Sequence, residues 1–119
     1  MTNEADIILK MIEEVDPADT DKLDEIDVLV YEYISDIGYR PSTSFPYTRS
    51  RDALKAIRPE GWYIKLDIFS VPGKPKWTCE CFNLTEGAGC FLSPVLPTEE
   101  LAELHAIIQA IEWERENDK

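Results

Sequence analysis

Residues 62–83 of the chain read WYIKLDIFSVPGKPKWTCECFN, and this stretch decides the fold. Two sets of side chains alternate along its first part, namely Trp62, Ile64, Leu66 and Ile68 against Tyr63, Lys65, Asp67 and Phe69. A period of two is typical of a half-buried β-strand, here over residues 62–69. Residues 76–83 repeat the pattern, with Trp77, Cys79 and Cys81 on one side, after a turn at residues 70–75. We therefore expect an antiparallel hairpin.

Turn and helix signals extend the pattern on both sides of this hairpin. Residues 84–89 (LTEGAG) form a second turn signal, and residues 90–92 can add a short third strand. Further along, Thr98 can cap a long helix that begins with two glutamates. The tail at residues 117–119 is expected to fray. The predicted buried stripe of this helix comprises Leu101, Leu104, His105, Ile108 and Ile111.

Three helices are predicted before the sheet. Asn3 can cap the first, whose apolar face holds Ile8, Met11, Ile12 and Val15 before Asp16-Pro17. Thr20 can cap the second and Gly38 can stop it; its apolar stripe comprises Leu23, Ile26, Val30, Tyr33, Ile34 and Ile37. After a Pro-containing loop at 39–47, Thr48 or Ser50 can cap a short third helix through Leu54 and Ile57 that ends before Pro59.

The predicted fold class is α+β: a small antiparallel three-stranded sheet sandwiched by helices, in the order α-α-α-β-β-β-α. The length of 119 residues predicts a single domain over 1–119 and excludes a two-domain enzyme with a separate cofactor domain. Both predicted sheet faces carry large apolar side chains, so either helices cover both faces or one face is a partner surface. The helices are numerous enough to cover both.

The N-terminal residues 1–10 lack the basic and apolar regions of a secretory signal, and apolar runs are too short for a membrane span. Three cysteines without a disulfide framework fit free thiols in a reducing compartment. We therefore expect a cytoplasmic protein that does not contact membrane.

The charge of the chain is strongly polarised. The total is −12, but residues 1–36 carry a net −10 and residues 92–119 a net −5, whereas residues 37–91 carry a net +3. A surface of this kind disfavours direct binding of nucleic acid, which needs clustered Lys and Arg. It serves solubility alone, or it is presented to a basic partner, as in proteins that mimic DNA.

Candidate chemistry is sparse. Cys79, Cys81 and Cys90 with His105 match zinc in ligand type, but Cys79 and Cys81 lie on a predicted strand rather than on a knuckle, so core packing is favoured and no metal or cofactor is expected. His105 has no Ser, Asp or second His at a helical spacing to orient it, and it is expected to be partly buried with one hydrogen bond. We therefore predict that the protein is not an enzyme.

Several segments together resemble the phage ABA-sandwich domain, a family of small proteins of tailed phages and prophages. They are Leu23-Asp24-Glu25-Ile26-Asp27, Pro46-Tyr47-Thr48, Ala53-Leu54, Pro59-Glu60-Gly61-Trp62, the Trp77 strand, and Pro97-Thr98-Glu99-Glu100 with the helix from Ala102 to Ala110. The resemblance covers roughly residues 20–115, leaving 1–16 as an N-terminal helical extension. It implies two helical layers around a small antiparallel sheet, and it carries over no catalytic or cofactor residue.

The function expected from these patterns is that of a phage or prophage accessory protein in the bacterial host cytoplasm. It would bind a protein partner with a basic surface, such as a host defence or nucleic-acid-handling enzyme. The candidate partner-binding residues are Asp19, Asp21, Asp24, Glu25, Asp27 and Glu32. Two alternatives remain open: a self-associating structural protein, for instance a homodimer, whose acidity serves solubility, and a small thiol or zinc protein.

Overall fold

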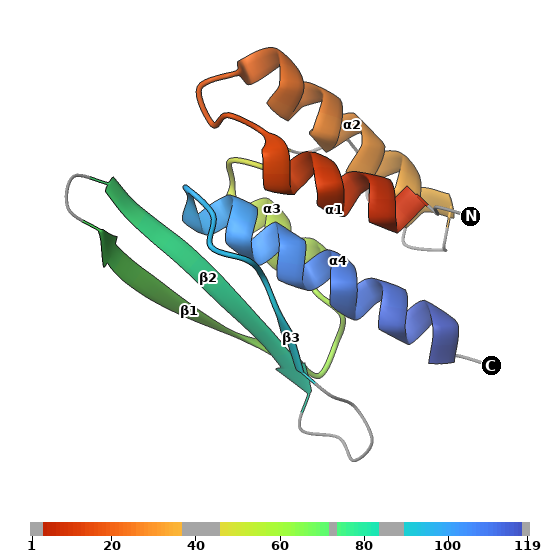
Figure 1. The fold of residues 1–119 in the computed structure, drawn as a ribbon. Helices are drawn as coiled ribbons and strands as arrows, with labels where there is room; N and C mark the ends of the chain where they lie inside the picture. Colours follow the sequence, from red (N-terminus) through yellow and green to blue (C-terminus); the bar gives the residue numbers. More distant parts are fainter. Residues whose placement is uncertain (1–3, 37–45, 72–73, 84–89, 118–119) are drawn as a thin grey trace.

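The structure is a computed structural model that describes residues 4–36, 46–71, 74–83 and 90–117 (Figure 1). In chain order its elements are α1 (Glu4–Glu14), α2 (Thr20–Asp36), α3 (Arg51–Ile57), β1 (Trp62–Val71), β2 (Lys74–Asn83), β3 (Cys90–Leu92) and α4 (Glu99–Asn117). The predicted α+β class and the order of elements are confirmed. Several predicted features lie outside the described residues: the Asn3 cap, Ile37 and Gly38 with most of the loop before Tyr47, the centre of the hairpin turn, the turn at 84–89 and the end of the C-terminal tail.

The sheet is antiparallel with strand order β1-β2-β3. Trp62 lies opposite Asn83 and Ile68 opposite Trp77, so the hairpin has the predicted pairing of faces. Gly61 precedes β1 with a positive φ of 89°, a conformation that glycine adopts without a steric cost. β3 begins and ends where the sequence places it, and it pairs Phe91 with Cys81.

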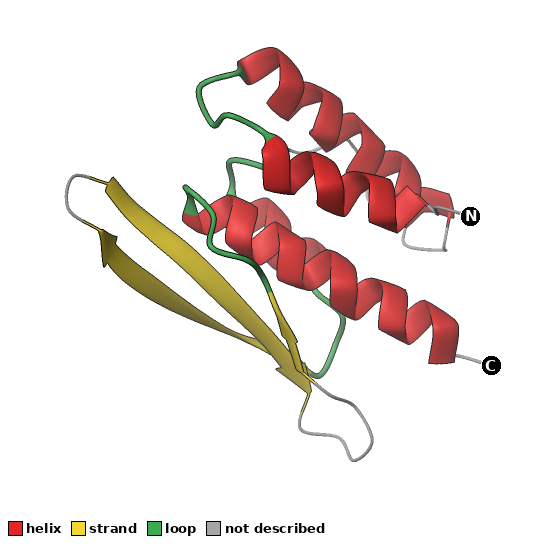
Figure 2. Ribbon diagram, in the orientation of Figure 1, coloured by secondary structure: helices red, strands yellow, loops and turns green. Residues whose placement is uncertain are grey.

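The layer order differs from the predicted sandwich. Helix α4 packs on one face of the sheet, mainly on β2, and α1 packs on the opposite side of α4, with α2 beside α1 (Figures 1 and 2). The described helices therefore all lie on one side of the sheet, and α4 rather than the sheet is the middle layer. The two helical layers around a sheet that the resemblance implies are not formed by this part of the chain.

The physical reason lies in α4. Residues 101–108 of this helix are buried all round, which requires neighbours on every side. The sheet covers one side through Trp62, Cys79 and Cys81, and α1 covers another through Ala5, Ile8 and Ile12. The far face of the sheet instead holds the exposed charged residues Lys65 and Asp67 and stays uncovered by the described helices.

Helix starts follow capping chemistry. Ser50 Oγ accepts from Ala53 N at 3.2 Å, and Thr98 Oγ1 accepts from Leu101 N at 3.2 Å, as predicted. The start of α2 corrects the prediction of Thr20: Asp19 Oδ1 accepts from Lys22 N at 3.2 Å, and Thr20 is already helical. A carboxylate one residue earlier reaches the free amide of the first turn.

No described helix is long and apolar enough to span a bilayer.

Candidate interaction surface

The outer layer of the molecule, formed by α1 and α2, carries a large net negative charge. Residues 4–36 hold 12 acidic and 2 basic side chains. The apolar stripe of α2 points inward as predicted, because its members Leu23, Ile26, Val30, Tyr33 and Ile34 are buried. The opposite face of the helix is therefore directed to solvent.

Four exposed residues define this solvent face of α2. Asp21, Glu25, Val28 and Glu32 follow one another at spacings of four, three and four residues, which places them in one row along a helix. Val28 keeps 49% of its surface exposed. We call this row the α2 stripe: three carboxylates around one exposed apolar side chain.

Asp27 does not lie on this surface, and the prediction that it is an exposed acid is wrong. It is buried at 5% exposure, and its carboxylate accepts from the backbone N of Thr48 at 2.8 Å and from Arg49 Nη2 at 2.9 Å. A buried carboxylate needs such partners, since it has lost its water. Asp27 therefore holds the turn at residues 46–50 against α2.

Three of the other predicted acids also make contacts inside the chain, although they are exposed. Asp24 pairs with Arg49, which lies between it and Asp27. Asp19 caps α2, and Glu25 pairs with Lys22 one turn earlier at 3.3 Å. Ion pairs of this exposed kind contribute little to stability and exchange easily for a partner's cation.

Asp21 and Glu32 are the two predicted acids with the simplest surroundings. Both are exposed, and no described residue forms a hydrogen bond or ion pair with either. They stand near the two ends of the α2 stripe. These carboxylates are thus fully available to a partner without loss of a described contact.

A small cavity lies near the start of α2, with a volume of about 130 Å³. Its walls come from several segments and comprise Pro17, Leu23, Thr48, Arg49, Thr98, Glu100 and Leu101. Sites for drug-sized ligands and cofactors span roughly 300–1,000 Å³. This cavity is suited to a few water molecules at most.

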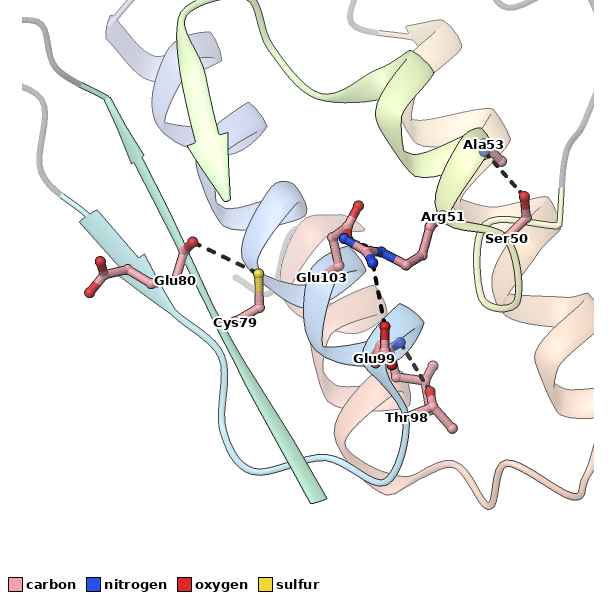
Figure 3. A network of polar contacts seen from close by, with 9 residues as sticks. Ser50, Arg51, Ala53, Cys79, Glu80, Thr98, Glu99 and Glu103 are labelled. Carbon is pink, nitrogen blue, oxygen red and sulfur yellow. Dashed lines mark hydrogen bonds and ion pairs between the residues drawn. The ribbon is translucent and has the colours of Figure 1, made fainter. Parts of the chain in front are cut away.

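A buried glutamate of α4 is paired with an arginine of α3. Glu103 of α4 is buried, and Arg51 of α3 donates to it from Nε at 3.0 Å and to Glu99 from Nη1 at 3.4 Å (Figure 3). Burial raises the pKa of Glu103, and Arg51 offsets only part of that effect. This network ties α3 to α4.

The cysteines occupy opposite faces of the sheet. Cys79 and Cys81 are buried, and burial raises the pKa of each thiol to about 12, so both are protonated at neutral pH. Cys90 is exposed and lies opposite Phe82, on the other face. The three thiols are not brought together, and the described residues contain no group of three or more His, Cys, Asp or Glu that could hold a metal.

His105 is buried with two hydrogen bonds rather than the predicted one. Its Nε2 lies 2.8 Å from Glu13 Oε2, and its Nδ1 lies 2.9 Å from Nε2 of Gln109. Because the amide nitrogen of Gln109 donates, Nδ1 is the acceptor and Nε2 carries the proton toward Glu13. Gln109 also donates to the carbonyl of Leu92 at 3.3 Å, so this chain joins α1, α4 and the end of β3.

The sequence reasoning missed three residues that shape this region. Gln109 stands four residues after His105, a spacing at which side chains meet on a helix, so its amide could have been identified as an orienting group from the sequence. Val28 interrupts the polar side of α2 and was detectable from periodicity alone. Arg49 carried no local signal, since its acidic partners are more than twenty residues away in the chain.

No protein-family model, no curated protein and no solved structure matches this chain.

Proposed function

We propose that the protein acts by binding another protein, and that the α2 stripe contacts a basic surface of that partner. The observation that carries the proposal is the row Asp21, Glu25, Val28 and Glu32, where an exposed apolar side chain lies among carboxylates. Interfaces of this composition combine an apolar contact at the centre with charges that steer the encounter.

The partner class follows from the charge. The α1–α2 layer holds ten more acidic than basic side chains, whereas residues 37–91 carry a net +3, so the field is directional rather than uniform. A partner with a basic groove, such as a nucleic-acid-handling or defence enzyme of a bacterial host, would meet this field. The stripe would then occupy a groove that otherwise holds phosphates, and the protein would act as a phage-encoded inhibitor in the host cytoplasm.

The test is a charge reversal on the stripe. Asp21→Lys with Glu32→Lys changes two residues that hold no described contact, so the fold should persist, as checked by circular dichroism. Immobilised protein is incubated with bacterial lysate, and retained proteins are identified by mass spectrometry. A basic protein retained by the wild type should be lost from the variant. It should also be released as salt rises from about 0.1 M to about 1 M, which shortens the Debye length from about 10 Å to about 3 Å.

A matched variant separates position from total charge. Glu60→Lys with Glu116→Lys changes the net charge equally, at exposed residues outside the α1–α2 layer. This control should retain the same protein as the wild type. Equal retention by all three proteins, or retention that ignores salt, would overturn the proposal. Val28→Asp keeps the stripe negatively charged but removes its apolar side chain. It should weaken retention of the partner, which tests the apolar contact separately from the charge.

A further inference from the structure

β1 is an edge strand with an unusually open outer side. It runs for 10 residues, pairs with β2 on one side only, and has no described strand on the other. Two large apolar side chains on it are exposed, Tyr63 at 50% and Ile68 at 57%. A long edge with free backbone donors and acceptors is a template for another strand unless it is blocked.

The side chains of β1 are complementary to β1 itself. In an antiparallel pair of two copies centred on Leu66, Lys65 lies opposite Asp67 of the second copy, and Asp67 opposite its Lys65. Ile64 likewise lies opposite Ile68 of the second copy, which covers the exposed Ile68. Opposite charges and β-branched side chains directly across an antiparallel pair are both stabilising.

Neighbouring registers lack this match. Centring the pair on residue 65 places Lys65 opposite its own copy, and centring it on residue 67 does the same for Asp67. Each alternative thus sets like charges directly across the strand pair, which destabilises it. The charges of β1 therefore select one register.

The rest of the fold leaves room for such pairing. α4 packs mainly on β2, and the described helices lie on one side of the sheet, so β1 forms a free margin of the molecule (Figure 1). With Leu66 on the axis, the helix-covered faces of both sheets lie on the same side. We propose that a second copy of this chain pairs with β1 through this register, giving a two-fold symmetric dimer with a continuous six-stranded sheet.

Charge variants test the pairing. Asp67→Lys places two lysines opposite each other twice per dimer, and Lys65→Glu places two carboxylates there twice. Each variant alone should sediment as a monomer at concentrations where the wild type is dimeric, with an association constant lowered about tenfold or more. An equimolar mixture of the two variants should form dimers again, since each lysine then meets a carboxylate.

Lys76→Glu is the matched control, because Lys76 is exposed on β2 rather than on the edge. It should stay dimeric, as should the Asp21→Lys with Glu32→Lys variant, so failure of this inference is distinguishable from failure of the proposed function. A wild type that sediments as a monomer at all concentrations, or single variants that remain dimeric, would overturn the inference.

Cross-linking tests the register directly and does not depend on the charge variants. In a Cys90→Ser background, Leu66→Cys sets two thiols on the axis at a Cα separation of about 4.5–5.5 Å, which a disulfide bridges. Oxidised glutathione should give covalent dimer and reduced glutathione. Ile68→Cys in the same background places its thiols about four residues apart along the strands and should give little. Equal yields from both variants would contradict a pair centred on Leu66.

Discussion

Helices α2 and α4 are both long and rich in acidic and apolar residues, yet their acidic side chains lie in opposite surroundings. α2 buries one stripe and presents Asp21, Glu25 and Glu32 to solvent. α4 is buried over residues 101–108, so that Glu103 and His105 lie inside the protein and find partners there. The comparison teaches that the surroundings of a charged residue, rather than the composition of its helix, decide whether it faces solvent or is paired inside the protein.

The largest expected effect contrasts an apolar residue of each helix. Leu104→Ala removes a fully buried side chain from the middle layer and should lower the free energy of unfolding by about 2–5 kcal/mol. Val28→Ala removes an exposed one and should change it by less than about 0.5 kcal/mol. Urea unfolding followed by circular dichroism measures both. Similar losses would mean that α2 is covered on both sides.

The next contrast concerns two acids of α2 itself. Asp27→Asn leaves Arg49 and the amide of Thr48 with a weaker acceptor, so it should lower the free energy of unfolding by about 1.5–3 kcal/mol. Asp21→Asn, at an exposed position without a described contact, should change the free energy of unfolding by less than about 0.5 kcal/mol. The pair is compared by thermal and urea unfolding at neutral pH. An Asp27→Asn protein as stable as the wild type would show that this carboxylate is not needed to hold the turn at 46–50.

A smaller effect is expected at the contact between α1 and α4. His105→Leu keeps an apolar body in the middle layer but removes both hydrogen bonds, to Glu13 and to Gln109. The free energy of unfolding should fall by about 1 kcal/mol, since Glu13 lies near the surface and its carboxylate can hydrogen-bond to water instead. Hydrogen exchange should show faster exchange of α1 amides than of α4 amides. Uniform protection in the variant would argue that apolar contacts alone hold α1.

Much of the fold was predictable because the local patterns agree with it. The period of two in residues 62–68 and the caps at Ser50 and Thr98 identify β1, α3 and α4 without tertiary information. The layer order was harder to predict, although one signal existed: apolar residues occur on every face of α4, as Leu101, Ala102, Leu104, Ile107 and Ile108 show. A helix that is apolar all round belongs in the middle of a fold, not on one face of a sheet.

The candidate surface was predictable in place but not residue by residue. The charge count identifies α2 correctly as an acidic helix. The removal of Asp27 from the surface, however, depends on Arg49 and Thr48, which approach it only when the chain between them folds back. A contact between segments distant in sequence leaves no periodic signal in either.

The smallest effect tests the sign of a charge in the middle layer. Because burial raises the pKa of Glu103, the folded state holds its proton more tightly than the unfolded state, and stability is lost as pH rises through the folded pKa. Glu103→Gln removes that loss, so its stability relative to the wild type should increase as pH rises from about 4 to about 7. Glu99→Gln, which removes the other partner of Arg51, is the control and should show no such increase. A Glu103→Gln protein that loses stability relative to the wild type over this range would show instead that Arg51 outweighs burial. The charge of the Glu103 carboxylate would then stabilise the fold. The acids of α2 and Glu103 of α4 would differ in their exposure to solvent, but not in whether their charge is tolerated.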